Sequence, residues 1–326
     1  MSSSSSTEDV VNTLKHGGFS AAVAPFRKSV MVFVSSTFTD TMVERNVLQE
    51  QILPGLKQLG REHDIEYIFF DMRYGVKDEN TLDHQTWIGC YNALKTCYDG
   101  SAGIFFLSLQ SGKYGYRMLP RTIPKDMLDA RVASCSEDIQ ALAAKWYILD
   151  TNTVPPVYVL KKLEKMNDDS FWKEALPQLR DAFKDLAFFD LNEDTVIGRS
   201  VTEYEVLLAM AMAESSSGGV DRLRWLFREV KNGHSEELDP WQFYSEYKDQ
   251  SALTLCDFLC KKMTSVFGEA NTQKTQIDAS VLIPKVSDDS GKLVLYDQKE
   301  EYENARLQEE ANTHYSKFKD SANDML

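Results

Sequence analysis

Four hydroxyl side chains and one carboxylate are found within six consecutive residues, Ser35 to Asp40 (SSTFTD). They follow a short apolar run, Val30–Val34, that is typical of a buried central strand. The oxygens of such side chains can accept hydrogen bonds from the free N–H groups at the start of the next helix. In an open α/β sheet, this turn is also the default position for a ligand. Spacing alone favours the first interpretation, in which Ser36 and Thr37 only cap a helix.

Two further polar turns carry groups that suit a phosphorylated or ring-shaped ligand. Arg73 follows the apolar run Ile65–Phe70, and Lys113 and Tyr114 follow the apolar run Gly103–Leu109. A guanidinium or an ammonium group can hold a phosphate, and a tyrosine ring can stack on a base. Because parallel strands end at a shared edge of their sheet, we expect one crevice to gather side chains from these turns and from one helix start. These side chains are Ser36, Thr37, Arg73, Tyr114 and Glu205, and together they suit a nucleotide or a sugar phosphate.

Arg73 and Tyr114 also have purely structural interpretations. Arg73 is expected close to the acids Asp40, Glu44 and Asp71, and an arginine among several acids usually pairs with one of them. We therefore favour an ion pair that locks the turns together over a phosphate contact. Tyr114 is an aromatic turn residue of the kind that more often packs as a wedge than stacks on a ligand.

The acidic residues near the predicted helix starts have structural interpretations as well. Ser200 and Glu203 have the S-x-x-E spacing of a capping box. Glu205 is expected to be a first-turn surface acid that the helix dipole favours, so its replacement should leave the fold intact. Glu44 and Arg45 are expected to form a solvated pair that contributes little to stability.

Strands alternate with helices through the first part of the chain. This succession predicts an α/β fold with a mainly parallel sheet and helices on both faces. We expect the first three strands to pair in the order second, first, third, as in flavodoxin-like folds. The expected strands are Val30–Val34, Ile65–Phe70 and Gly103–Leu109. Helices are expected to begin near Met42 and Thr81 after the first two strands, and a further strong helix is expected to open near Ser200.

The rest of the chain is less regular. Asp126–Leu149 has a helical pattern, whereas Leu223–Val230 has strand character but carries two arginines and a glutamate, which indicates a peripheral strand. Beyond Pro240 the apolar face is sparse, so we expect helices that pack outside the sheet and add no strand to it. The expected organisation is a disordered or short helical N-terminus (1–24), an α/β domain (25–235) with an insertion at about 117–198, and a helical extension or linker (236–326).

Composition excludes several functional classes. The 326 residues are 43% hydrophobic, which permits a real core, and the net charge of −14 disfavours binding to nucleic acid or to an anionic membrane. The five cysteines form no CxxC pair and the five histidines have no metal-ligand spacing, so we expect reduced thiols, a cytoplasmic location and no metal. We find no signal peptide, membrane span, P-loop, GxGxxG, GxSxG or HExxH motif. No single motif makes a strong case for an enzyme.

Four segments stand out together, namely VFVSSTFTDTMVER (Val32–Arg45), FDMRYGV (Phe70–Val76), FFLSLQSGKYGY (Phe105–Tyr116) and SVTEYE (Ser200–Glu205). Together they resemble the landmark segments of the TIR-like domain that heads many NACHT and WD-repeat proteins. A related domain occurs in the telomerase- and vault-associated protein. The resemblance covers roughly residues 25–235, and Arg73-Tyr74-Gly75 departs mildly from the Arg-Trp-Gly that is common in the family. The NACHT domain and WD propeller that would follow are not in this sequence, so we expect either a part of a longer product or a domain that acts alone.

The resemblance implies a flavodoxin-like sheet and an interaction or effector module in a signalling protein, with protein partners and possible self-association. A third hypothesis is a scaffold within a ribonucleoprotein, and the negative net charge of the chain argues against it. Many TIR-like domains only self-associate, and fold similarity by itself never establishes catalysis.

The alternative is an NAD(P) glycohydrolase or another nucleotide-processing enzyme, with NAD(P) or another nucleotide as ligand. Some TIR domains cleave NAD at the nicotinamide–ribose bond with one helical glutamate, and Glu205 is similar to it in position, with Glu203 the next candidate. A carboxylate there would steady an oxocarbenium-like transition state. The ligand-binding candidates would be Ser36, Thr37, Arg73, Lys113 and Tyr114.

Overall fold

The structure is a computed structural model. It describes residues 28–37, 40–74, 82–165, 168–184, 187–190, 193–196, 198–231, 249–278, 286–287, 293–294 and 305–326. The N-terminal segment 1–24, for which we predicted disorder or a short helix, lies outside these residues.

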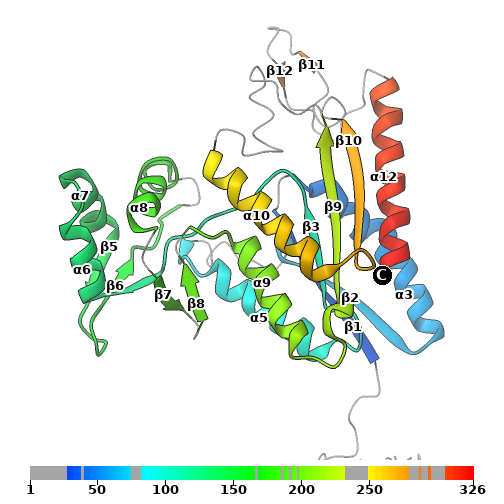
Figure 1. Ribbon diagram of the computed structural model, residues 1–326, viewed down its shortest axis with the longest axis horizontal. Helices are drawn as coiled ribbons and strands as arrows, with labels where there is room; N and C mark the ends of the chain where they lie inside the picture. The colour runs from blue at the N-terminus through cyan, green and yellow to red at the C-terminus, as the bar shows by residue number, and fades with distance from the viewer. Residues whose placement is uncertain are drawn as a thin grey trace, which may run out of the picture.

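A five-stranded sheet forms the centre of the molecule, and all of its strand pairs are parallel (Figure 1). The strand order is β10-β9-β3-β1-β2, so β1 lies between β2 and β3 as the sequence predicted. This is the 2-1-3-4-5 order of flavodoxin-like folds, and the predicted α/β class is confirmed. The strands are β1 (Lys28–Ser35), β2 (Ile65–Asp71), β3 (Phe106–Gln110), β9 (Leu223–Lys231) and β10 (Thr272–Asp278).

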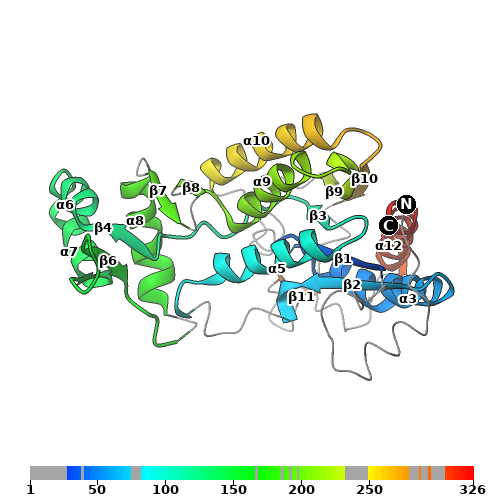
Figure 2. The same ribbon diagram turned by 90° about the horizontal axis from the view of Figure 1, so that it is seen from below.

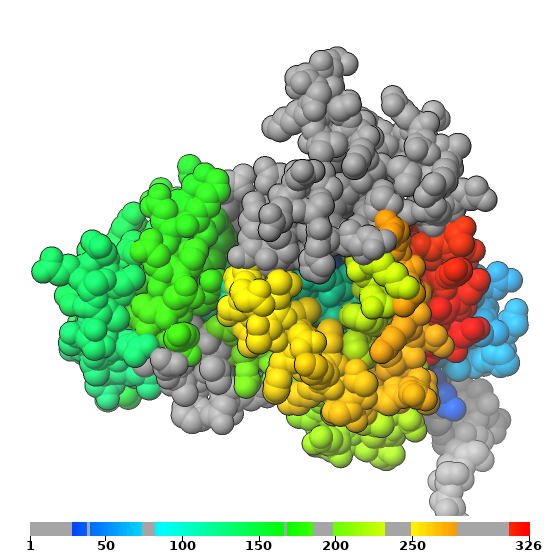
Figure 3. Space-filling view, turned by 45° about the horizontal axis from the view of Figure 1, so that its top comes forward, coloured from blue at the N-terminus to red at the C-terminus, as the bar shows by residue number. Residues whose placement is uncertain are grey.

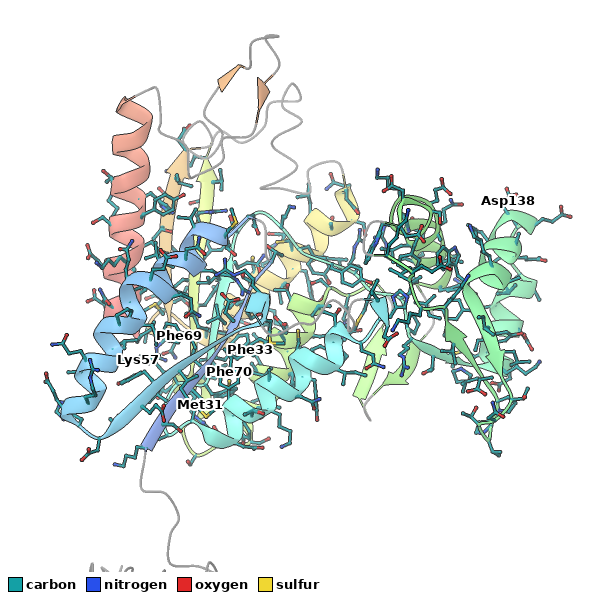
Figure 4. The ribbon with its side chains drawn as sticks, turned by 180° about the vertical axis from the view of Figure 1, so that it is seen from behind. Met31, Phe33, Lys57, Phe69, Phe70 and Asp138 are labelled. Carbon is teal, nitrogen blue, oxygen red and sulfur yellow. The ribbon has the colours of Figure 1, made fainter. Side chains whose placement is uncertain are left out.

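The apolar runs form the interior strands because they are covered on both faces of the sheet. Every residue of β3 is buried, as are Val32, Phe33 and Val34 of β1. Phe33 lies opposite Phe70 of β2 and Phe106 of β3, and its ring stacks against that of Phe106 with centroids 6.3 Å apart. Figure 4 shows Phe33 and Phe70 side by side on the two strands.

Helices cover both faces of the sheet (Figure 2). On one face, α5 (Thr86–Gly100), α9 (Val201–Glu214) and α10 (Gln250–Phe267) enclose a core around Trp87, Leu94 and Trp225. The other face is covered by α2 (Met42–Val47), the π-helical segment η1 (Leu48–Ile52), α3 (Leu53–Glu62) and α12 (Ala305–Met325), which bury Val32, Leu48 and Phe318 among others.

A small lobe with its own apolar core stands at the opposite end of the molecule from α12 (Figure 3). Its core includes Trp146, Phe171 and Phe183, which are at most 4% exposed. The predicted helix Asp126–Leu149 is wrong in part, because two helices and the start of a strand occupy this range. The lobe contains β4 (Thr122–Pro124), α6 (Lys125–Ala133), α7 (Glu137–Trp146), β5 (Tyr147–Asp150), β6 (Val157–Leu160), η3 (Ser170–Ala175) and α8 (Leu176–Phe183). A separate antiparallel pair, β7 (Ala187–Asp190) and β8 (Glu193–Val196), follows it in the chain.

Two predictions about the second half of the chain are wrong. Leu223–Val230 is not a peripheral strand: β9 lies between β3 and β10, and its charged Arg228 is 4% exposed because buried partners surround it. The chain beyond Pro240 does add a strand to the central sheet, since β10 pairs with β9 along its whole length. Its polar sequence (TQKTQID) is typical of an edge strand. This sequence has too little apolar alternation to predict a strand.

The remaining short elements are η2 (Met72–Tyr74), η4 (Gly219–Arg222), β11 (Val286–Ser287) and β12 (Leu293–Val294). Within the described residues, none of the helices combines the length and the apolar character needed to cross a membrane.

Candidate functional site

The turns that were predicted to carry ligand groups lie at the edge where the parallel strands end. Arg45, which projects from α2, ties the end of β1 to the end of β2. Its Nε donates to Ser36 Oγ at 2.5 Å, its Nη2 donates to the carbonyl oxygens of Val34 and Ser36, each at 3.1 Å, and its Nη1 pairs with Asp71. Arg45 is 1% exposed, so the expectation that Glu44 and Arg45 form a solvated pair is wrong.

Arg73 binds the same carboxylate from the other side. Its Nη2 and Nε lie 2.7 and 2.9 Å from Asp71 Oδ2, and its Nη1 donates to Asn46 Oδ1 at 2.9 Å. Burial alone would raise the pKa of Asp71, but hydrogen bonds from Arg73 and the charge of Arg45 outweigh it and hold that pKa below its usual value. The structural interpretation of Arg73 is therefore confirmed: its guanidinium locks the turns together.

Glu205, the candidate catalytic carboxylate, is 5% exposed and lies in the second turn of α9. Its Oε2 accepts a 2.6 Å hydrogen bond from Ser35 Oγ, and the Cys90 thiol also hydrogen-bonds to it. Burial raises the pKa of Glu205 to about 7 against the opposing effects of Ser35, Cys90 and Arg45. The expectation of a first-turn surface acid is therefore wrong, because the first-turn acid is Glu203 and Glu205 is enclosed.

Glu203 and Tyr114 form a second buried pair. Ser200 Oγ accepts from the Glu203 N–H at 3.1 Å, which confirms the Ser200 side of the predicted capping box. The Glu203 carboxylate accepts from the Tyr114 hydroxyl and lies 3.8 Å from Arg199 Nε. Tyr114 is fully buried, and burial together with the charge of Glu203 raises the pKa of its hydroxyl. Its ring packs in the core and offers no free face for stacking.

Two further candidates, Thr37 and Lys113, are partly exposed, and Thr37 holds the turn after β1 together. Thr37 Oγ1 donates to Asp40, and its carbonyl oxygen accepts from Ser36 Oγ at 2.8 Å and from Thr41 Oγ1 at 2.9 Å. Lys113 is near enough to Asp40 for its charge to oppose the rise in the pKa of that carboxyl. These hydroxyls thus bond mainly within their own turn.

A second buried network was missed by the sequence analysis. Arg228 of β9 pairs through Nη1 with Glu44 Oε1 at 2.7 Å, and it donates through Nη2 to the carbonyl oxygen of Asp40 at 2.6 Å and through Nε to Ser111 Oγ at 3.0 Å. His314 of α12 lies 3.4 Å from the same Glu44 oxygen. Arg228 lies two residues after Leu226 on the same face of β9, and both are buried. That face carries Arg224, Leu226 and Arg228, so its sequence has no apolar alternation that would indicate an inward arginine.

The two acids of this network have opposite pKa shifts. Burial would raise the pKa of Glu44, but Arg228 and His314 lower it to about 2. Burial raises the pKa of Asp40 to about 7 although Arg228 and Lys113 oppose the rise. Asp40 Oδ2 and Glu44 Oε2 have no hydrogen-bond partner within the part of the chain that the structure describes.

The predicted residues are therefore brought to one edge but engaged in separate internal contacts. Arg73 binds Asp71, Tyr114 binds Glu203, and Glu205 accepts from Ser35. Two carboxyls with a pKa near neutrality, Asp40 and Glu205, are the groups best suited to proton transfer. In the described ranges, no group of three or more histidine, cysteine or acidic side chains is arranged to hold a metal ion.

Comparison with known proteins finds similarity over part of the chain. It is 27% identical over 181 residues to human NACHT and WD repeat domain-containing protein 2, which covers 50% of this chain and 10% of that protein. It is 30% identical over 121 residues to mouse NACHT domain- and WD repeat-containing protein 1, which covers 36% of this chain and 8% of that protein.

A shorter match extends to a third type of protein. The chain is 27% identical over 89 residues to rat telomerase protein component 1, covering 27% of this chain and 3% of that protein. It thus spans a tenth or less of the length of these relatives. No protein-family model and no solved structure matches the chain.

Proposed function

We propose that this chain is a protein-association module of the kind that heads NACHT and WD-repeat signalling proteins. The similarity to parts of two such proteins supports this context. One observation carries the proposal. At the edge where the parallel strands end, the side chains that a nucleotide would need already bind neighbouring side chains. Arg73 is committed to Asp71, and Tyr114 and Glu205 are at most 5% exposed.

Exposed apolar side chains supply a surface for association. Three of the large apolar side chains that are exposed among the described residues lie between positions 148 and 154: Ile148 is 56% exposed, Leu149 38% and Val154 99%. Ile148 and Leu149 belong to β5, an edge strand of the β4-β6-β5 sheet, and they line a groove of about 890 Å³. An open edge strand with apolar side chains is a template for pairing with another strand.

The occupant that we assign to this edge is a second copy of the chain. Two antiparallel β5 strands would form an isologous contact in which each Ile148 meets the same surface of its partner. Sedimentation velocity over a concentration series tests the proposal. Association that grows with concentration supports it, whereas a single-chain mass at every concentration would count against it.

The alternative function is nucleotide hydrolysis, with Glu205 as the carboxylate and NAD(P) as the substrate. The observation in its favour is that the pKa of Glu205 is raised to about 7, because shifted carboxyls are common at catalytic sites. Incubation of the purified chain with NAD, followed by measurement of nicotinamide, separates the two functions. Release that is lost in Glu205→Gln would favour the enzyme.

A further inference from the structure

α12 is held to the domain by one narrow face. Four of its described side chains are buried, and Phe318 and Ala322 are 2% and 0% exposed. These four residues are spaced by four, four and three positions, so they lie on one side of the helix. They are His314, Phe318, Ala322 and Met325.

α12 contacts β9, β10, α2 and η1, and it runs alongside the edge strand β10 (Figure 1). Its polar contact there is specific. His314 Nε2 lies 3.4 Å from Glu44 Oε1, which also accepts from Arg228 Nη1 at 2.7 Å. His314, Glu44 and Arg228 are at most 4% exposed.

The same arginine reaches the two turns at the candidate site. Arg228 donates to the carbonyl oxygen of Asp40 in the turn after β1 and to Ser111 Oγ in the turn after β3. A continuous path of hydrogen-bonded groups therefore runs from α12 through Glu44 and Arg228 to both turns. The other charged or titratable groups that act on this path are Asp40, Lys113 and Tyr315.

We propose that α12 is a conformational latch whose docking is coupled to the turns after β1 and β3 through the Glu44–Arg228 pair. A buried ion pair is stable only while its geometry and its cover are kept. Undocking of α12 removes His314 and the apolar cover from the pair. Conversely, a change in either turn moves Arg228 and misaligns the carboxylate that His314 meets. Binding at the sheet edge thus changes how often the C-terminal helix opens.

Two serines in and after β3 provide a matched pair of variants. Ser111 Oγ accepts from Arg228 Nε at 3.0 Å, whereas Ser108 Oγ is fully buried and has no hydrogen-bond partner among the described residues. Neither belongs to α12. We would measure hydrogen exchange of α12 amides in the full chain, in Ser111→Ala and in Ser108→Ala. Ser111→Ala is expected to speed exchange in α12 by roughly three- to tenfold, and Ser108→Ala to leave it unchanged.

Phe318→Ala tests the coupling in the opposite direction. It weakens the docking of α12 without touching the ion pair, and it is expected to speed exchange in residues 40–47 as well as in α12. Three results would overturn the latch: equal α12 exchange in Ser111→Ala and the parent, no change in residues 40–47 in Phe318→Ala, or α12 amides that exchange in the parent as fast as an unfolded peptide.

Discussion

Ser35 Oγ donates a 2.6 Å hydrogen bond to the carboxylate of Glu205 and thereby joins the end of β1 to α9. Both side chains are buried, and the contact lies next to the Cys90 thiol and within the field of Arg45. The Glu205 carboxylate is therefore an internal connection between the sheet and α9.

Glu205→Gln is predicted to change the pH dependence of stability. The native pKa of Glu205 is raised from 4.5 to about 7, so between these values the native state binds more protons than the unfolded state. Its carboxyl therefore destabilises the parent progressively from pH 4.5 to 7, by up to about 3 kcal/mol. The stability of Glu205→Gln relative to the parent should rise over this window in urea titrations. A difference that is constant from pH 4.5 to 7.5 would refute the shift.

Arg45→Met should be strongly destabilising. It removes the buried partner of Asp71 and the donor to the carbonyl oxygens of Val34 and Ser36, at a cost of about 3 kcal/mol or more; Ser36 Oγ still accepts from Thr41 Oγ1. Arg73→Met, which removes a 15% exposed partner of the same carboxylate, should cost less than about 2 kcal/mol. Chemical denaturation measures both. Equal losses would show that burial does not distinguish the two arginines.

Phe171→Ala should loosen the small lobe first. Phe171 is fully buried and packs edge-on against Trp146 with ring centroids 4.9 Å apart, so its loss should cost about 3 to 5 kcal/mol. Hydrogen exchange should rise in residues 119–183 before it rises in β1 and β3. Phe258→Ala, at a 63% exposed position, is the control and should change stability by less than about 0.5 kcal/mol. Uniform loosening of both parts would contradict a separate core in the lobe.

The order of β1, β2 and β3 was predictable because these strands are mainly apolar runs with distinct turns after them. β9 was expected at the periphery because Arg224 and Arg228 were counted as exposed charges, and β10 was missed because an edge strand with polar side chains has little apolar pattern. Burial of Arg228 depends on Glu44 and Asp40, which lie more than 180 residues away in sequence.

Part of the pairing at the sheet edge was predicted, since Arg73 was expected to pair with an acid and binds Asp71, but the partners of Glu44, Arg45 and Glu205 were not. The carboxyl ends of parallel strands had to meet, so Ser36 and Arg73 were expected at one edge. Glu44 and Arg45 are adjacent in sequence but bind different partners. Arg45 pairs with Asp71, whereas Glu44 pairs with Arg228, and local spacing does not predict either partner. The contact of His314 with Glu44 was not predictable either. The helix of His314 has few apolar residues, so its sequence did not indicate which face packs on the domain.

Sedimentation velocity of the parent, Ile148→Asp and Leu59→Asp tests the association proposal most directly. Ile148 and Leu59 are 56% and 48% exposed, but only Ile148 lies on the β5 edge strand, whereas Leu59 belongs to α3. A charge on β5 would be buried against a partner strand, so we predict that the parent and Leu59→Asp associate with increasing concentration while Ile148→Asp keeps the mass of one chain. A parent that stays a single chain, or equal association of all three proteins, would contradict the account.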